Sequence, residues 1–361
     1  MKVLSPAPRE VWRSIIACSD QATAFHTPEW LDAACEAGGF EDASRLYETR
    51  EGRHLVLPMV RAPGPLPGMR SDWSMPPNWG FGGVIASGVV RERDINALLT
   101  AGVRPTSAWC RMIIKPGPIT GGAWARALPR RRIPHLVHLV DLRGGFSELW
   151  SKRFSHNTRK LIRRSEKQGI VVERDDTGRL LRDSYDVYLR WSVQGAAAQG
   201  IPSSAAVAQA KRSEPFAQYE AVARRLGARC RVWIAQIDGQ AIASIITLLH
   251  GAHAHCWRSS SDRKRAGRAN DLLQARAIED AAESGCSYYH MGESGGVESL
   301  MAFKEKFGAE RRVYDELRFE PFLIGKIGNI RDHLAFVRGA ATGVRAFRRG
   351  VPGHEHKGFR T

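Results

Sequence analysis

The sequence predicts an α/β protein with mixed sheets, built from two consecutive halves. The chain is 361 residues long, a length that suits two domains of ordinary size. Apolar runs of strand length also alternate with amphipathic segments of helix length. We expect domains over 1–146 and 170–320, a connecting helix over 147–169, and an amphipathic tail over 321–361 that packs back on the first domain.

The C-terminal half has the clearer pattern, with the predicted order β-α-α-β-β-β-α-β-α-β. Its predicted strands are short and rich in β-branched residues, and they cover 170–174, 231–237, 241–249, 253–259, 287–292 and 312–319. Its predicted helices have apolar residues at helical spacing, and they cover 180–199, 205–226, 271–284 and 297–307. The loop over 261–270 connects a strand to a helix.

The N-terminal half repeats this order more loosely. Its predicted helices cover 8–18, 28–37 and 91–100, and its predicted strands cover 44–49, 55–60, 83–86, 108–115 and 135–142. The segment 61–82 is rich in Pro, Gly, Trp and Met. It is too irregular for a helix or strand and too aromatic for a linker, so we expect a loop that lines a site. Trp79 lies in this loop and is a candidate for the acceptor pocket, with core packing as the alternative.

The composition excludes several classes of protein. Hydrophobic residues make up 43% of the chain and charged residues 25%, which is typical of a soluble globular protein rather than a coiled coil, a collagen or a disordered chain. The six cysteines form no CxxC pair, which argues against a zinc ribbon, a redox motif or a disulfide framework. With no signal peptide or membrane-spanning run, we expect a cytoplasmic monomer.

The net charge is +17, from 54 Lys and Arg against 37 Asp and Glu. Four segments together carry a larger positive charge than the whole chain, and they are 95–140, 147–169, 258–268 and 325–361. Such concentration predicts a surface that binds anions, although an arginine-rich composition on solvated faces would look the same. The tail over 325–361 has basic residues beside an apolar stripe. Contact with nucleic acid, or with an anionic membrane at the inner face, is therefore an alternative to packing.

The segment 147–169 predicts one helix with a basic face. Its apolar residues fall on the other side of the helical wheel. The cationic side chains that share one arc are Lys152, Arg153, Arg159, Lys160, Arg163, Arg164 and Lys167. We expect Arg159 and Arg163 to contact an anionic substrate, and an ordinary solvated face is the alternative.

The loop before the helix over 271–284 has the composition of a phosphate site. Small residues let backbone N–H groups turn toward a ligand, and the positive end of a helix dipole follows. The residues that we expect to hold a phosphate are Lys264, Arg265, Gly267, Arg268, Ala269 and Asn270. Asn270 would also cap the helix.

Several motifs together resemble the FemAB/FemX-like branch of the GNAT acyltransferases, whose members are tandem GNAT domains. The resemblance covers roughly 20–320 and rests on F-H-T-P-E-W (25–30), L-P-M (57–59), G-F-G-G (80–83), F-S-H-N-T-R-K (154–160), W-R-S-S-S-D (257–262), Y-Y-H-M-G-E-S (288–294) and L-M-A-F-K-E-K-F-G-A (300–309). The loop resembles the pyrophosphate motif of GNAT proteins, [Q/R]-x-x-G-x-[G/A], but Lys264 stands where Gln or Arg is usual.

The resemblance implies acyl transfer from a phosphate-bearing donor to an amine. It assigns the tetrahedral oxyanion to Lys304, and a fixed cation is chemically suited to that task. An amine nucleophile must also lose a proton, and the candidate bases are Glu293, which we prefer, His290 and Asp262; proton loss through water without a protein base is the alternative. His253, His255 and His290 invite a metal interpretation, but they lack supporting ligands, so we expect no metal.

Three functions remain open. The first is an N-acyltransferase that uses acyl-CoA, with the thioester along the strand that ends near Trp257 and the acceptor between the halves. The second is a FemX-like transferase that uses aminoacyl-tRNA and acts on a peptidoglycan precursor or a small metabolite. The third is a basic adaptor without catalytic activity, which binds a membrane or nucleic acid.

Overall fold

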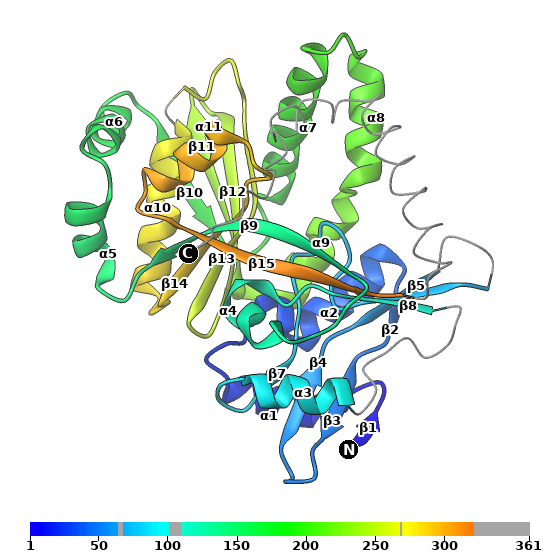
Figure 1. The fold of residues 1–361 in the computed structure, drawn as a ribbon. Coiled ribbons are helices and arrows are strands. Elements are labelled where there is room, and N and C mark those ends of the chain that lie inside the picture. The colour runs from blue at the N-terminus through cyan, green and yellow to red at the C-terminus, as the bar shows by residue number, and fades with distance from the viewer. Residues whose placement is uncertain (64–67, 101–109, 268, 321–361) are drawn as a thin grey trace, which may run out of the picture.

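The computed structural model describes residues 1–63, 68–100, 110–267 and 269–320, and two sheets organise this part of the chain (Figure 1). Within it, eleven strands form a mixed sheet in the order β10-β11-β12-β13-β14-β9-β15-β8-β6-β5-β2, and four form a smaller sheet in the order β1-β3-β4-β7. Arg268 and the tail over 321–361 lie outside the described residues. The predicted α/β class with mixed sheets is confirmed.

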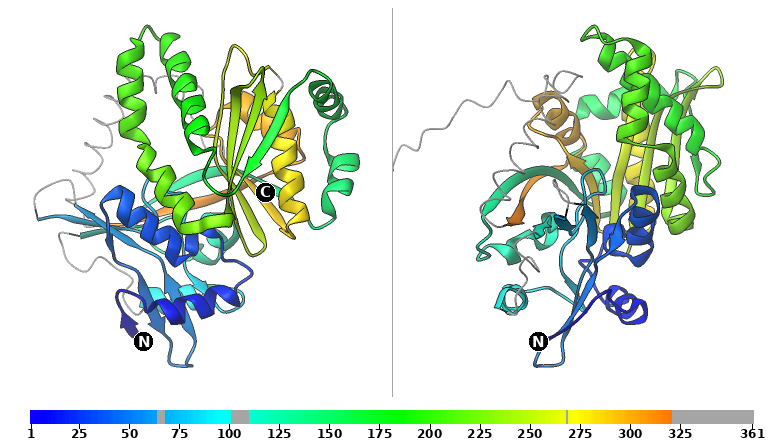
Figure 2. Two further views of the ribbon diagram at one scale, coloured as in Figure 1. Left: turned by 180° about the vertical axis from the view of Figure 1, so that it is seen from behind. Right: turned by 90° about the vertical axis from the view of Figure 1, so that its right-hand side faces the viewer.

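The C-terminal half forms one end of the large sheet. Its strands are β10 (Val171–Asp175), β11 (Cys230–Ile237), β12 (Gln240–His250), β13 (His253–Ser261) and β14 (Tyr288–Glu293). Helices α7 (Leu181–Ala197) and α9 (Phe216–Leu226) cover one face of these strands and α10 (Ala269–Glu283) covers the other (Figures 1 and 2). Strand periodicity explains both layers, because alternate residues of β11 and β12 join the two separate cores.

Two predictions for the helices of this half need adjustment. The single helix predicted over 205–226 is wrong, since the chain forms α8 (Ser203–Ser213) and then α9. Pro215 separates them: it disfavours helical geometry at Glu214, whose φ and ψ are −138° and 83°. The last predicted helix is α11 (Glu298–Glu305), which follows β14.

The N-terminal half contributes to both sheets. The small sheet consists of β1 (Lys2–Leu4), β3 (Arg45–Glu48), β4 (His54–Leu57) and β7 (Ile85–Ala86). The large sheet receives β2 (Glu41–Asp42), β5 (Val60–Pro63), β6 (Arg70–Trp73) and β8 (Cys110–Ile114). The helices are α1 (Arg9–Ala17), η1 (Ala24–His26), α2 (Pro28–Gly38), α3 (Glu92–Thr100), α4 (Gly117–Thr120) and η2 (Gly121–Trp124). The prediction of a loop without strands over 61–82 is wrong, because most of β5 and all of β6 lie in it.

The two halves exchange strands at the centre of the large sheet. Strand β9 (Arg131–Asp141), from the N-terminal half, pairs with β14 on one side and with β15 (Glu310–Phe319) on the other. Strand β15, from the C-terminal half, then pairs with β8. Figure 1 shows β9 and β15 running side by side between the two groups of helices. The predicted halves therefore share one continuous sheet.

The connecting segment is not the single helix that its periodicity predicts. It forms α5 (Gly145–Glu148), a π-helical turn η3 (Leu149–Arg153) and α6 (His156–Glu166). Phe154 adopts extended backbone geometry, and Ser155 begins α6 by accepting a hydrogen bond from the Thr158 N–H. Helices α5 and α6 both pack against α10, so this segment is an outer layer of the C-terminal half rather than a link between halves.

A buried ion pair joins the small sheet to the large one. Asp72 on β6 is fully buried and accepts a hydrogen bond of 2.9 Å from Arg45 on β3. Arg61 on β5 binds the same carboxylate through two hydrogen bonds of 2.7 and 3.0 Å. Both guanidinium groups therefore depend on one carboxylate.

Replacing Asp72 by Ala should destabilise the fold strongly, because it leaves Arg45 buried without its counter-ion. We expect the free energy of unfolding to fall by about 3 to 5 kcal/mol. The matched control is Asp315→Ala, which breaks an ion pair with Arg132 whose side chains are 35% and 33% exposed and should cost at most about 1 kcal/mol. Urea denaturation measures both losses, and equal losses would contradict the proposed role of Asp72.

Candidate functional site

Strands β13 and β14 are parallel neighbours that separate along their length. They pair only from His253 with Tyr288 to His255 with His290. Each strand then contains a bulge: Trp257 is an extra residue relative to β12, and β14 carries an extra residue relative to β9 just before Glu293. Gly292 has a φ of +73°, a backbone geometry that favours glycine. The two bulges open a wedge in the sheet.

A cavity of about 270 Å³ lies at this wedge. Both halves line it. The lining residues are Phe25, Asn78, Gly80, Phe81, Lys115, Pro118, Val137, His255, Cys256, Trp257, Arg258, His290, Gly292, Glu293 and Tyr314. The cavity therefore combines aromatic walls with a few charged groups, as is common for sites that bind small molecules.

Glu293 is the centre of a polar network in the cavity. Its Oε1 lies 2.7 Å from Lys115 Nζ and accepts a hydrogen bond of 2.9 Å from the Tyr314 hydroxyl. Its Oε2 lies 3.0 Å from His135 Nδ1. Burial raises the pKa of Glu293, but His135 and Lys115 outweigh burial and hold that pKa well below its usual range. Burial likewise lowers the pKa of His135, but the nearby carboxylates of Glu293 and Glu316 outweigh burial, so the net effect is a raised pKa.

Lys304 is buried behind the bulge of β14. Its ammonium group donates hydrogen bonds of 2.8 Å to the carbonyl oxygens of both Gly292 and Glu293. The third N–H of this ammonium has no acceptor among the described residues. Burial lowers the pKa of Lys304 to about 8, although Cys256 and Glu293 act in the opposite direction. The side chain thus fixes the geometry of the bulge and keeps one donor uncommitted.

The face of the sheet under the cavity carries histidines. His253 Nδ1 lies 3.1 Å from His290 Nε2, and the rings of His255 and His290 stack with centroids 3.9 Å apart. Burial lowers the pKa of all three below the usual value. Within the described ranges, no group of three or more His, Cys, Asp or Glu side chains is placed to hold a metal ion.

The loop before α10 is organised by Asp262. Its Oδ1 accepts hydrogen bonds from the backbone N–H groups of Lys264 and Arg265, at 2.9 and 3.1 Å, and from the Gln194 side chain at 2.9 Å. Asp262 was also predicted to contact substrate; it is buried, does not line the cavity and accepts three hydrogen bonds through Oδ1, so in this structure it organises the loop. Lys264, Arg265 and Gly267 are exposed.

The predicted cap of this helix is also wrong. Helix α10 begins at Ala269, which places Asn270 inside its first turn instead of at the N-cap. The backbone N–H groups of Asn270 and Asp271 make no hydrogen bond to the described residues. They are therefore available to a ligand at the positive end of the helix.

The remaining predicted site residues divide into those at a cavity and those that support the fold. Trp257 lines the cavity at the wedge, and its buried indole N–H has no acceptor in the described part of the chain. Trp79 is buried against Trp30 with ring centroids 5.4 Å apart and does not line the cavity, so core packing is the correct alternative. Arg159 donates hydrogen bonds to the carbonyl oxygens of Trp150, Ser151 and Phe154, which explains its role without an anion.

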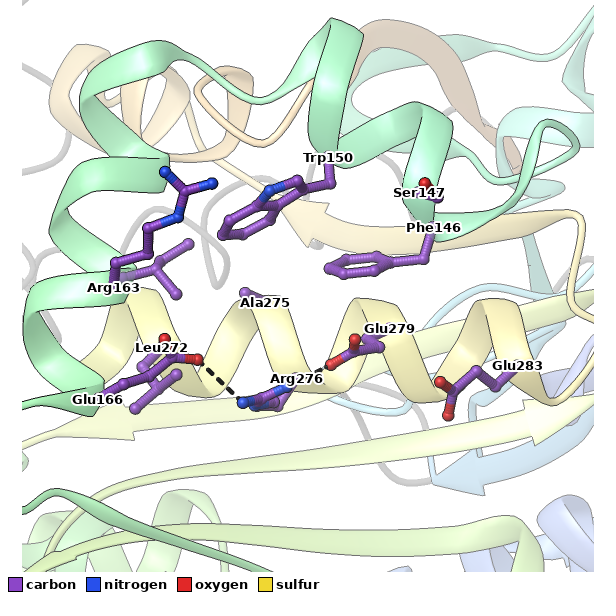
Figure 3. A pocket seen from close by; sticks show the side chains of 11 residues that line it. Phe146, Ser147, Trp150, Arg163, Glu166, Leu272, Ala275, Arg276, Glu279 and Glu283 are labelled. Atoms are coloured by element: carbon purple, nitrogen blue, oxygen red, sulfur yellow. Dashed lines mark hydrogen bonds and ion pairs between the residues drawn. The ribbon is translucent and has the colours of Figure 1, made fainter.

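Arg163 lies at a second pocket of about 510 Å³ between the connecting segment and α10 (Figure 3). Its guanidinium group lies over the Trp150 ring at 5.9 Å. Figure 3 shows Trp150 and Phe146 above α10, where Arg276 bridges Glu166 and Glu279. The carboxylates around this pocket make it a poor site for an anion.

Sequence reasoning missed the residues that complete the cavity from the N-terminal half and the exchanged strands. Lys115, His135 and Tyr314 surround Glu293, yet they lie far from it in the sequence. Lys115 stands at the end of a predicted strand, which is a weak signal for a site. His135 and Tyr314 give no signal, because only the pairing of β9 with β15 brings them together.

The family comparison agrees with this geometry. Residues 152–305 match the acetyltransferase (GNAT) domain, and this span contains both diverging strands, α10 and Lys304. This part of the chain is therefore similar to the GNAT acetyltransferases. No curated protein sequence matches it.

The chain is similar in fold to FemX over most of its length. The crystal structure of FemX has 11% sequence identity and a TM-score of 0.61, over 87% of this chain and 97% of that chain. A conserved protein of unknown function from Bacteroides thetaiotaomicron VPI-5482 has 11% identity and a TM-score of 0.52, over 86% of this chain and 98% of that chain. The predicted resemblance to FemX is confirmed at the level of the fold. None of the described helices is long and apolar enough to cross a bilayer.

Replacing Glu293 by Gln should lower the pKa of His135, because the carboxylate raises this pKa above 6.5. The raised pKa of His135 stabilises the fold below pH 6.5, and this contribution disappears as the pH rises through the raised value. The lowered pKa of Glu293 stabilises the fold above pH 4.5, and this contribution disappears as the pH falls through the lowered value. The loss of unfolding free energy in the variant should therefore be largest between pH 4.5 and 6.5.

NMR titration of the His135 imidazole and denaturation at several pH values test this prediction. Glu310→Gln is the control, because Glu310 is half-exposed and pairs with Arg153 instead of His135. An unchanged pKa of His135 in Glu293→Gln would show that the contact does not exist in solution.

Proposed function

We propose that this acyltransferase moves an acyl group from acyl-CoA to a primary amine in the cavity at the wedge. The observation that carries the proposal is the divergence of the parallel strands β13 and β14 beside a cavity lined by both halves. A thioester that enters between these strands meets unpaired backbone at the bulges and the indole N–H of Trp257. An amine enters from the N-terminal half, along Asn78 and Phe81.

The phosphates of the donor would bind at the start of α10. Three features support this position: the exposed side chains of Lys264 and Arg265, the backbone N–H groups of Asn270 and Asp271, and the positive end of the helix. The predicted set of Lys264, Arg265, Gly267, Arg268, Ala269 and Asn270 remains our proposal for this subsite. The amides of Lys264 and Arg265 are already bonded to Asp262, so their side chains, rather than their backbone, would contact the donor.

The charged groups suggest separate roles. Glu293 is a weak base because its pKa is low, so we assign it to binding the acceptor as an ammonium ion and not to proton removal. Its carboxylate oxygens accept three bonds, which leaves room for one more donor. Lys304 lies behind the bulge and does not itself line the cavity; we assign its positive charge and its uncommitted N–H to the tetrahedral oxyanion that forms beside the bulge when the amine attacks the thioester carbon.

Replacing Gly267 by Trp should weaken CoA binding. A Cβ at Gly267 would meet only the Arg265 carbonyl oxygen, at 4.0 Å, so the ring fits the fold but blocks the subsite. We expect the Kd for CoA to rise about tenfold or more, which corresponds to the loss of at least one charge-assisted hydrogen bond. Isothermal titration calorimetry measures this change.

Gly285→Trp is the matched control. Gly285 also has a positive φ, of +81°, and open space around its Cβ, but it follows the opposite end of α10. Both variants place a Trp at a positive φ, and only Gly267→Trp should change the Kd. Equal effects, or no saturable CoA binding by the wild type, would refute the subsite.

Replacing Lys304 by Met should lower kcat roughly hundredfold to thousandfold, as removal of an oxyanion donor does. Because the Lys304 pKa is about 8, activity should fall as the pH rises through that value and the ammonium loses its charge. Lys304→Arg keeps the charge and should move this fall to higher pH. The release of free CoA from acetyl-CoA, measured with a panel of primary amines, gives kcat as a function of pH. Lys211→Met on α8 is the control. An unchanged kcat in Lys304→Met would exclude oxyanion stabilisation by Lys304.

The second candidate donor is aminoacyl-tRNA, and the surface of α6 favours it. Lys160, Arg163, Arg164 and Lys167 are exposed on this helix, and together with Arg159 and His156 they line a shallow basic surface. Binding to tRNA would weaken steeply with salt, because each neutralised phosphate releases counterions. Salt-dependent tRNA binding that CoA does not compete with would replace the first candidate by the second.

A further inference from the structure

The histidines under the cavity form a directed chain of hydrogen bonds. His253 on β13 and His290 on β14 lie on the face of the sheet that meets the N-terminal half. His253 Nε2 lies 2.9 Å from the carbonyl oxygen of Asp20, in the segment before η1. His253 Nδ1 lies 3.1 Å from His290 Nε2. The chain of contacts therefore runs from the N-terminal half to the cavity.

Only one arrangement of protons satisfies these contacts in neutral rings. The Asp20 carbonyl oxygen accepts but cannot donate, so His253 must carry its proton on Nε2. His253 Nδ1 is then an acceptor, and His290 must donate to it from Nε2. His290 Nδ1 consequently carries a lone pair, and the hydrogen bond recorded for the His290 ring among the described residues is the one at Nε2.

The surroundings keep both rings neutral. His255 stacks on His290, and His26 on η1 and His250 on β12 contribute further imidazoles. Burial lowers the pKa of His26 to about 3 and that of His250 to about 4. His290 and His253 are 4% and 0% exposed. This apolar setting disfavours a second proton on any of the rings.

We infer that His290 is the catalytic base of the proposed acyl transfer. His253, which is anchored by the Asp20 carbonyl, is the positioning residue: it turns the lone pair of His290 Nδ1 toward the acceptor amine. This inference rests on the proposed function. The amine nitrogen bonds to the thioester carbon, and its proton passes to His290 Nδ1. The C–S bond then breaks, and the thiolate takes the proton from His290 to leave as the free thiol of CoA.

A weakly basic imidazole is sufficient for this step. The nitrogen gains positive charge when it bonds to the carbonyl carbon, and it becomes much more acidic at that moment. A neutral His290 is ready to accept this proton without first losing one of its own. Glu293 remains the group that attracts the ammonium form of the acceptor before it loses its first proton to solvent.

The proton positions are testable without any activity. Nitrogen-15 spectra of the full-length protein, labelled on histidine, distinguish protonated from unprotonated ring nitrogens. We expect His253 and His290 both to carry the proton on Nε2, with signals assigned from their absence in His253→Asn and His290→Asn. A proton on Nδ1 of His290 in the wild type would overturn the inference.

Kinetics with paired variants test the positioning role. His253→Leu removes the acceptor for His290 Nε2, so we expect kcat to fall about tenfold, the effect of losing one hydrogen bond in a buried network, with the KM for acyl-CoA unchanged. His253→Asn offers an amide oxygen near the position of Nδ1 and should recover most of the loss. His250→Asn is the matched control. His250 on β12 is the cross-strand partner of His253 on β13, but it makes no hydrogen bond to His290 among the described residues.

The outcomes separate the two proposals. An active wild type whose kcat falls equally in His253→Leu and His253→Asn would overturn the positioning role and leave acyl transfer intact. A wild type that neither binds CoA nor turns over would refute the proposed function, whereas the nitrogen spectra would still report the proton positions. Melting temperatures of all variants identify any loss that comes from unfolding alone.

Discussion

The parallel pairing of β13 and β14 ends after His255 and His290, and the organisation of the site depends on this early end. A continued ladder would close the sheet and leave no cavity. The bulges at Trp257 and at Gly292 prevent that closure, because an extra residue in each strand breaks the register with its outer neighbour. Lys304 then holds the carbonyl groups of the second bulge, so the wedge is a fixed feature of the fold.

The exchange of β9 and β15 supplies the other wall of the wedge. His135 and Tyr314 come from these adjacent strands and meet Glu293 from β14, while Lys115 follows β8. One carboxylate is thus surrounded by residues from both halves of the chain. Beside the span that matches a GNAT domain, the N-terminal half contributes Lys115, Phe25 and Phe81 to the cavity and the Asp20 carbonyl oxygen to the histidines.

Much of the fold was predictable from local pattern. The strands of the C-terminal half, α7, α10 and the motif around Lys304 follow from periodicity and turn residues. The failures have local causes that were visible: Pro215 divides a helix, and Ser155 begins a new one. Strands β5 and β6 were not predicted because they are short. Their position depends on Asp72, which binds two arginines that are distant in the sequence.

The sequence by itself determined the α/β class, the order of elements, the GNAT resemblance and the candidate residues Lys304, Glu293 and His290. Tertiary structure alone decided which of these share a cavity and what protonation each can have. The reason is physical: the pKa of Glu293 depends on Lys115 and His135, and the proton positions on His290 depend on a carbonyl from the other half. Such contacts form between strands that the chain connects only over long distances, so no local pattern records them.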